Sequence, residues 1–365
     1  MNIAFYIDEM NFRGIANSTY QYALNNQKIL KNKSIIFYNK KNSDNKKEVI
    51  IRFKKKFKIF GINSFNEIEL SKSRLKIDYI YTQKGGEKDK WISKKIETLI
   101  HSVYPQSLNQ VHGHRYASIS EWLSKKFYNN KISPLPYIVE IDKSKINLKK
   151  KLKIKKNQII FGCHGGVSSF DLTFVKDTLK KIVNKRKDIV VLFLNIKKFI
   201  NHPRIIFLKG SSDNTYKKRF LNTCDAMIYG RSLGESFGLA CGEFAVQGKK
   251  LILYKFNRHR SHMYNLDNNC YEEYSSCKTL YKILNNFKKR KINKIYQKNN
   301  KYLKYNSKII MRKFDQIFLK NNVIKKLNLY DYLINYFGFV EMNFYYLRHK
   351  IYTNYYRLIE SKLNL

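Results

Sequence analysis

The first third of the chain alternates short apolar runs with longer amphipathic stretches. The apolar runs predict buried strands at 2–8, 34–39, 77–83, 98–104 and 116–120. Apolar positions at helical spacing predict helices over 15–30 and 120–130. Strands that alternate with helices are typical of βα units, so this part predicts an α/β lobe built on a parallel sheet.

A second alternating series follows a break at 131–157, where prolines give way to a run of lysines. Strands are predicted at 158–166, 189–196, 204–211, 226–231 and 250–255, with helices at 174–186, 214–224 and 236–248. The pattern predicts a second α/β lobe. Ligands of such lobes bind beyond the carboxyl ends of the strands, so the loops there are the candidate sites.

These patterns divide the chain into a lobe at 1–145, a lobe at 146–320 and a helical extension at 321–365. The extension is rich in tyrosine, phenylalanine and basic residues. Aromatic and cationic side chains share the membrane–water interface, so an anionic membrane surface is one predicted partner. A helix packed against the protein or against another subunit is the alternative.

The large net charge and the cysteine content say little about which partners the protein binds. The 365 residues hold 72 Lys and Arg against 27 Asp and Glu, a net charge of +45. The lysines are scattered, and the enriched residues have A/T-rich codons, so the charge is weak evidence for nucleic acid. The five cysteines form no C-x-x-C pair, which is typical of reduced cytosolic thiols. With no basic leader and no apolar run of about 18 residues, we expect a cytoplasmic protein, soluble or peripheral on the inner membrane face.

Two acids, Glu235 and Glu243, flank a glycine-rich stretch after a predicted strand. A helix that begins just after Glu235 separates them by about 12 Å along its axis. That exceeds the roughly 5 to 9.5 Å between the paired acids of glycoside hydrolases. The glycines and the helix N-terminus between them suit a phosphate, so the pattern indicates a nucleotide-sugar held at two points. Two solvated acids on a surface helix are the competing interpretation.

The stretch GESFGLACGE, residues 234–243, resembles the E-x7-E element of retaining glycosyltransferases of family 4, and the resemblance extends over 223–254. It implies the GT-B fold, an α/β architecture of two Rossmann-like, doubly wound lobes facing a central cleft. The donor then binds mainly in the second lobe and the acceptor in the first. Glu235 is implied to hold the donor sugar at the reacting centre, and Glu243 the ribose.

The resemblance also implies further site residues. Donor contacts are expected from Gly14, Gly165, Gly166, Arg231, Ser236, Phe237 and Gly238, besides the two glutamates. His101 is expected to be catalytic, beside the donor sugar, and the candidate cleft or acceptor contacts are Arg13, His112, His164 and His262. Cys163 stands near a position where many family members carry arginine. His112 and His114 are spaced for one face of a strand, but no third ligand is apparent, so no metal is expected.

The predicted function is transfer of a sugar from a nucleotide-sugar to a glycan or lipid-linked acceptor. Retention of configuration, absence of a metal or other cofactor, and a place in bacterial polysaccharide or lipopolysaccharide biosynthesis are what the resemblance implies. Two alternatives remain open: a carbohydrate- or polyanion-binding protein on the same fold without catalysis, and a basic nucleic-acid-binding protein. Specific nucleic-acid binding is not expected, because the motif-bearing loops are glycine-rich and partly acidic.

Overall fold

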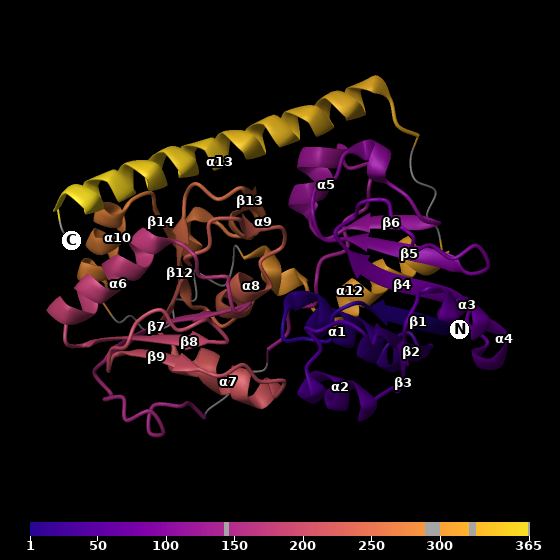
Figure 1. The fold of residues 1–365 in the computed structure, drawn as a ribbon, viewed down its shortest axis with the longest axis horizontal. Coiled ribbons are helices and arrows are strands. Elements are labelled where there is room, and N and C mark those ends of the chain that lie inside the picture. The colour runs from indigo at the N-terminus through magenta and orange to yellow at the C-terminus, as the bar shows by residue number, and fades with distance from the viewer. Residues whose placement is uncertain (142–145, 289–299, 321–325, 364–365) are drawn as a thin grey trace. The chain divides into compact units, whose positions relative to one another are not determined.

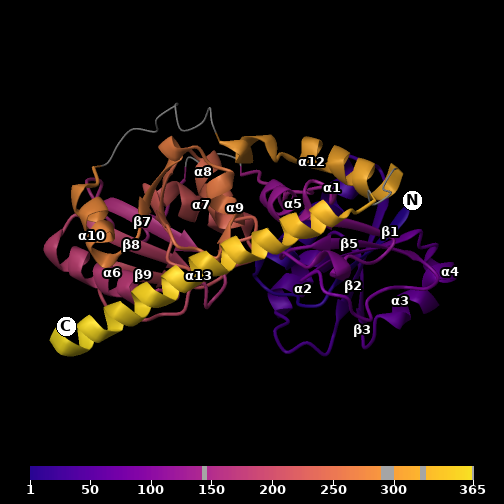
Figure 2. The ribbon, with the colours of Figure 1, turned by 90° about the horizontal axis from the view of Figure 1, so that it is seen from above.

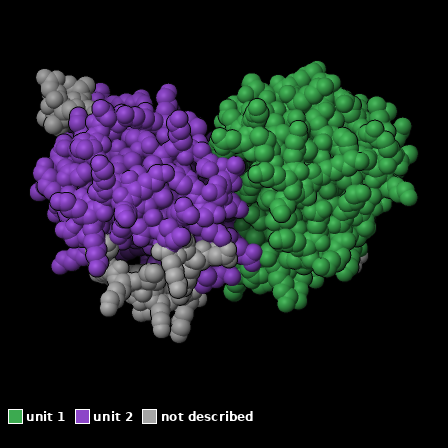
Figure 3. All heavy atoms as spheres, turned by 90° about the horizontal axis from the view of Figure 1, so that it is seen from below, with its two compact units in different colours: residues 1–138, 304–339 green, residues 139–303, 340–365 purple. Residues whose placement is uncertain are grey.

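The computed structural model describes residues 1–141, 146–288, 300–320 and 326–363, which form two compact units (Figure 3). The first unit comprises Met1–Ile138 and Lys304–Phe339. The second comprises Val139–Leu303 and Val340–Leu365.

The first unit is built on a six-stranded parallel sheet with strand order β3-β2-β1-β4-β5-β6. Its strands are β1 (Asn2–Ile7), β2 (Lys33–Asn39), β3 (Lys58–Ile62), β4 (Tyr79–Lys84), β5 (Glu97–Ser102) and β6 (Arg115–Ser118). The helices from the N-terminal part are α1 (Gly14–Lys28), α2 (Lys47–Lys54), α3 (Asn66–Leu70), α4 (Lys72–Leu75), η1 (Leu108–Gln110) and α5 (Glu121–Tyr128). From further along the chain, α12 (Ser307–Phe314) and the turn η4 (Asp315–Lys320) belong to the same unit.

Apolar side chains on both faces of the central strands explain why this sheet is parallel and covered. Ile3, Ala4 and Phe5 of β1 have no exposed surface, and Ile35 and Ile36 of β2 have none either. A strand buried on both sides has apolar residues in an unbroken run, as the sequence shows.

The second unit repeats the architecture with strand order β14-β12-β10-β7-β8-β9. Its strands are β7 (Ile159–His164), β8 (Ile189–Leu194), β9 (Ile205–Leu208), β10 (Ala226–Ile228), β12 (Lys250–Tyr254) and β14 (Tyr271–Tyr274). Its helices are α6 (Thr173–Lys185), α7 (Asn214–Thr223), α8 (Leu239–Val246), α9 (Ser261–Tyr264), η2 (Asn268–Cys270), α10 (Cys277–Asn286) and η3 (Lys301–Lys304). A separate parallel pair joins β11 (Gly234–Glu235), which follows β10 in the chain, to β13 (His259–Arg260), which follows β12.

The C-terminal segment is one continuous helix, α13 (Leu329–Leu363), drawn in yellow in Figures 1 and 2. Its residues up to Phe339 belong to the first unit, and those from Val340 onward belong to the second. Within the described residues, no helix combines the length and apolarity that a membrane crossing requires.

Two parallel six-stranded sheets confirm the predicted α/β class. The strands β3 and β14 were not predicted, because β3 is largely half-exposed and β14 reads YEEY, so neither shows an apolar run. The units also differ from the predicted ranges, since residues 304–320 belong to the first unit and the extension is divided between the two. The predicted boundary at 145 and the predicted start of the extension at 321 lie outside the described residues.

Candidate active site

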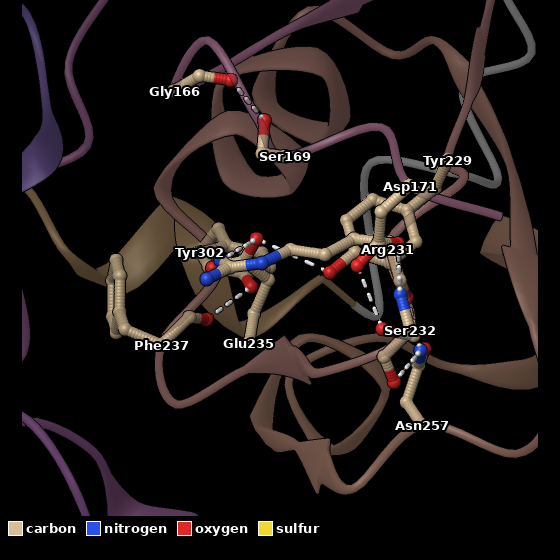
Figure 4. A network of polar contacts seen from close by, with 10 residues as sticks. All are labelled: Gly166, Ser169, Asp171, Tyr229, Arg231, Ser232, Glu235, Phe237, Asn257 and Tyr302. Atoms are coloured by element: carbon tan, nitrogen blue, oxygen red, sulfur yellow. Dashed lines mark hydrogen bonds and ion pairs between the residues drawn. The ribbon is translucent and has the colours of Figure 1, made fainter. Parts of the chain in front are cut away.

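Glu235 lies in β11, a few residues beyond the end of β10, and its side chain is 23% exposed. Its Oε1 accepts hydrogen bonds from the Tyr229 hydroxyl at 3.1 Å and from Nη1 of Arg231 at 3.0 Å (Figure 4). Burial and the nearby carboxylate raise the pKa of Tyr229 far above its ordinary value, so the phenol keeps its proton and donates. The contacts therefore hold one carboxylate oxygen in place on a partly exposed side chain.

The loop that carries Arg231 is itself anchored by polar side chains (Figure 4). Asp171 accepts from the Ser232 amide and from the Ser232 hydroxyl, both at 2.7 Å. Nδ2 of Asn257 donates to the Arg231 carbonyl at 2.7 Å. Two segments distant in sequence, at Asp171 and at Asn257, thus fix the loop that supports Glu235.

The turn from Glu235 into α8 depends on two glycines with positive φ. Gly234 has φ 74°, and a Cβ there would lie 2.0 Å from the carbonyl oxygen of His259. Gly238, the N-cap of α8, has φ 84°, and its Cβ would lie 2.6 Å from that of His262. The Tyr302 hydroxyl donates to the Phe237 carbonyl at 2.7 Å and holds the turn from the other side.

This geometry corrects the predicted helix at 236–248. The helix α8 begins at Leu239, because Gly238 has a left-handed conformation that cannot continue an α-helix. Glu235 lies in a strand before the turn. The axial separation of about 12 Å assumed a helix starting beside Glu235, so it does not describe the observed pair.

Glu243 lies inside α8 and is 3% exposed. Nζ of Lys217 lies 2.5 Å from its Oε1, and Nε2 of His164 lies 3.0 Å from its Oε2. Burial alone raises the pKa of Glu243, but Lys217 and His164 outweigh it and lower the pKa to about 2. The carboxylate is therefore ionised and already has basic groups beside both oxygens.

The glycine loop after β7 is held by hydrogen bonds within the loop and by one from Asn195. Gly166 accepts from the Ser169 amide at 2.9 Å and from the Ser169 hydroxyl at 2.7 Å, and Nδ2 of Asn195 donates to the Gly165 carbonyl at 2.7 Å. Cys163 at the end of β7 is buried, and desolvation raises the pKa of its thiol. It is a neutral thiol and supplies no charge for a phosphate.

His262 lies directly under the turn at Gly238 and is fully buried. Its ring packs against Tyr229 at 5.0 Å between centroids, and burial lowers its pKa to about 3. A neutral ring without exposed surface thus supports the turn at Gly238, and the contact of His262 with a cleft or acceptor stays a prediction.

In the first unit His101 lies inside the core. The residue is within β5, has no exposed surface, and its Nδ1 is 2.7 Å from the Tyr81 hydroxyl. Tyr22, Tyr137 and Phe318 pack around the ring, and burial lowers its pKa to about 3. The catalytic contact expected of His101 stays a prediction, for a ring that is buried in this structure.

The other first-unit candidates have protein partners. Nδ1 of His112 lies 2.7 Å from the Gln110 carbonyl, and Nδ1 of His114 accepts from the Thr98 amide. Arg13, with a side chain 56% exposed, pairs with Glu9 at 3.1 Å and Asp44 at 3.7 Å. Gly14 opens α1, and a Cβ there would come only within 3.9 Å of Tyr137.

The second unit thus brings together part of the predicted set, namely Arg231, Glu235, Ser236, Phe237 and Gly238, with His262 beneath them. Sequence reasoning missed the residues that hold this set: Tyr229, Lys217, Asp171, Asn257 and Tyr302. Only Tyr229 had a signal, since it lies near the end of the strand predicted at 226–231. Across the parts of the chain that the structure describes, no three His, Cys, Asp or Glu side chains are grouped to hold a metal ion.

Neither a protein-family model nor a curated protein sequence matches the chain. Solved structures do match. A glycosyltransferase from Rickettsia africae ESF-5 is 14% identical, with a TM-score of 0.62 over 88% of this chain and 99% of its own. Anabaena Alr3699/HepE, solved with UDP and glucose, is 12% identical, with a TM-score of 0.63 over 87% of this chain and 100% of its own.

The same fold also occurs with another reaction. A protein from Listeria monocytogenes assigned as a UDP-N-acetylglucosamine 2-epimerase is 10% identical, with a TM-score of 0.55 over 86% of this chain and 94% of its own. At these sequence identities the similarity establishes the fold alone. The reaction has to be inferred from the residues of the site. The chain has the GT-B fold of these nucleotide-sugar enzymes.

Proposed function

We propose that the protein is a glycosyltransferase that moves a sugar from a nucleotide-sugar to a glycan or lipid-linked acceptor. The observation that carries the proposal is Glu235, a partly exposed carboxylate held by Tyr229 and Arg231 at a glycine turn into a helix. The E-x7-E resemblance, which implies that Glu235 holds the donor sugar in the second lobe of a GT-B fold, supports the proposal.

The chemistry required of this site is stabilisation of a departing diphosphate. An acceptor hydroxyl oxygen bonds to the anomeric carbon, the bond from that carbon to the diphosphate oxygen breaks, and the hydroxyl proton passes to the departing diphosphate. Fixed dipoles and cations aimed at the leaving group lower such a barrier most. Backbone amides at the start of α8 and Arg231 are the groups we assign to this role, with retention and without a metal.

We propose that a UDP-sugar is the donor, supported by the UDP and glucose bound to the Anabaena protein. Glu243 is assigned to the ribose, as the resemblance implies. Lys217 and His164 each contact one carboxylate oxygen, and each oxygen can accept a second hydrogen bond, so these contacts leave acceptor capacity for a ribose hydroxyl.

The test is incubation of the full chain with UDP-, GDP- and ADP-sugars while free nucleoside diphosphate and sugar isomers are both measured. We expect release of one nucleoside diphosphate, reduced roughly hundredfold in Glu235→Gln and roughly tenfold in Tyr229→Phe. Glu48→Gln, on an exposed face of α2, serves as the matched control and should retain full release.

Two outcomes would contradict the proposal. Conversion of the donor to a sugar isomer without transfer would assign the site to the epimerase class. Binding of donors with no turnover across a panel of glycan and lipid-linked acceptors would favour a carbohydrate-binding protein that has lost catalysis.

A further inference from the structure

Helix α13 turns its most apolar face away from the protein. Eight large apolar residues recur every three or four positions, which places them on one side of the helix. We call them the outer stripe: Leu333, Phe337, Val340, Phe344, Leu347, Ile351, Tyr355 and Leu358. Each is between 46% and 62% exposed. An apolar surface of this length on a water-soluble protein indicates an interaction site.

The opposite face of α13 meets the first unit through polar groups, a glycine and the ring of Phe339, which lies 5.1 Å from that of Phe127 between centroids. Buried Asp331 accepts from Nδ2 of Asn129 at 2.9 Å. Asn335 donates from Nδ2 to the Phe127 carbonyl at 2.8 Å. Gly338 allows a close approach, since a Cβ there would lie 2.6 Å from the Lys126 carbonyl oxygen.

The part of α13 in the second unit is held in the same way. Nδ1 of His349 lies 3.3 Å from the Tyr254 hydroxyl, and the Tyr352 hydroxyl accepts from the Cys277 amide at 2.8 Å. The Tyr356 hydroxyl donates to Asp177 at 3.2 Å. A surface helix ordinarily buries its apolar face and exposes its polar one. In α13 the protein-facing side mixes polar groups with Met342 and the rings of Tyr352 and Tyr356, while the outer stripe stays exposed, so packing on the protein does not explain the stripe.

Two partners could cover the outer stripe, a second copy of the chain or a membrane, and the charges beside the stripe distinguish between them. Its spacing of three and four would also suit a coiled coil with a second copy of the chain. The exposed charges beside it are mainly basic, with Arg348, Lys350 and Arg357 against Glu341 among the described side chains. A second copy would bring these cations together, whereas an anionic lipid surface would neutralise them. The exposed tyrosines Tyr330, Tyr336 and Tyr355 also suit a membrane–water interface.

We propose that α13 lies flat on an anionic membrane, with the outer stripe inserted at the boundary between headgroups and acyl chains. The flanking cations then contact the phosphates. The inference goes beyond the proposed function and does not depend on it, because it rests on the exposed face of one helix. A chain held at a membrane in this way would lie where lipid-linked acceptors are presented.

The first experiment is sedimentation of the full chain with vesicles of phosphatidylcholine and phosphatidylglycerol, and separately of phosphatidylcholine alone. The test variant is L347Q/I351Q/L358Q, whose residues are 57%, 61% and 62% exposed. Its matched control is I51Q/L70Q/L303Q, which replaces residues that are 42%, 81% and 42% exposed on other elements. Glutamine is a good helix former, so α13 should persist, and circular dichroism checks that it does.

We expect the parent and the control to bind anionic vesicles equally, and the stripe variant to bind about a hundredfold more weakly. Removing two flanking cations in K350Q/R357Q should weaken binding to anionic vesicles about fivefold for each charge. Binding to neutral vesicles should be weaker than to anionic ones for the parent chain.

Three results would overturn the proposal. The first is a parent chain that does not bind anionic vesicles. The second is a stripe variant that binds as well as the control does. The third is a lipid-free parent dimer that becomes a monomer in the stripe variant, measured by sedimentation velocity, because the outer stripe would then be a subunit interface.

Discussion

At the scale of single residues, the two glutamates of the motif have different surroundings. Glu235 is partly exposed, and one oxygen is fixed by a phenol and a guanidinium. Glu243 is buried between Lys217 and His164. The same residue type therefore serves two purposes, because an exposed carboxylate is available to a ligand while a buried one must be balanced by the protein.

The pairing of Glu243 predicts a loss of stability that depends on pH. The pKa of Glu243 is lowered to about 2 in the folded state, so the unfolded chain takes up this proton first as pH falls. The stabilisation is fully present above roughly pH 4.5 and is lost between there and pH 2, an effect on the order of 3 kcal/mol. Glu243→Gln should therefore be less stable than the parent at pH 7, with a smaller difference at pH 3.

Urea unfolding of both proteins at several pH values measures this difference. Glu48→Gln, in which an exposed acid is replaced, should match the parent at every pH. A difference between parent and Glu243→Gln that stays constant down to pH 3 would show that the carboxylate charge contributes nothing to stability.

At the scale of elements, two turns decide where site residues lie. The left-handed turn at Gly238 prevents α8 from starting earlier in the chain, so Glu235 lies in a strand and not in the helix. The start of α1 at Gly14 has ordinary helical geometry and free space beside it. One glycine is thus required by the fold, and the other is required only if a ligand approaches closely.

Gly238→Ala should destabilise the second unit by about 2 kcal/mol, because it combines a left-handed backbone with a Cβ 2.6 Å from that of His262. Thermal unfolding measures the effect. Gly85→Ala is the control, since a Cβ there would meet nothing within 4 Å. Equal stability of the two variants would mean that the turn can rearrange at no cost.

Gly14→Ala tests the predicted donor contact in the first unit. The nearest atom to an added Cβ is Cε2 of Tyr137 at 3.9 Å, so alanine fits and should raise the free energy of unfolding by about 0.4 to 1 kcal/mol by restricting the unfolded chain. If the donor approaches this backbone, the KM for the donor should rise about tenfold without a fall in thermal midpoint. An unchanged KM would remove Gly14 from the site.

At the scale of the whole molecule, net charge should act on stability. With a charge of +45, repulsion among the cations opposes the compact state. Raising NaCl from roughly 20 to 200 mM shortens the Debye length about threefold, so the thermal midpoint should rise. KCl should have the same effect, because screening depends on ionic strength. A midpoint that falls with either salt would contradict this prediction.

Much of the fold was contained in local sequence. Apolar runs such as NIAFYI and IVVLFL are strands whichever unit they join, because burial on both faces requires apolar residues without interruption. The glycines of the motif were informative for a similar reason, since positive φ and close contacts leave few other residues possible. Charged or half-exposed strands such as β14 carry no comparable signal.

The sequence by itself determined the α/β class, the two-sheet plan and the place of Glu235 beyond a strand, because these follow from short-range periodicity and backbone geometry. Only the tertiary structure decided that His101 and His262 are buried, that Lys217 and His164 flank Glu243, and that α13 exposes its apolar face. Each of these depends on contacts between segments far apart in the chain. Periodicity shows that a helix has an apolar face, but only its neighbours decide which face is covered.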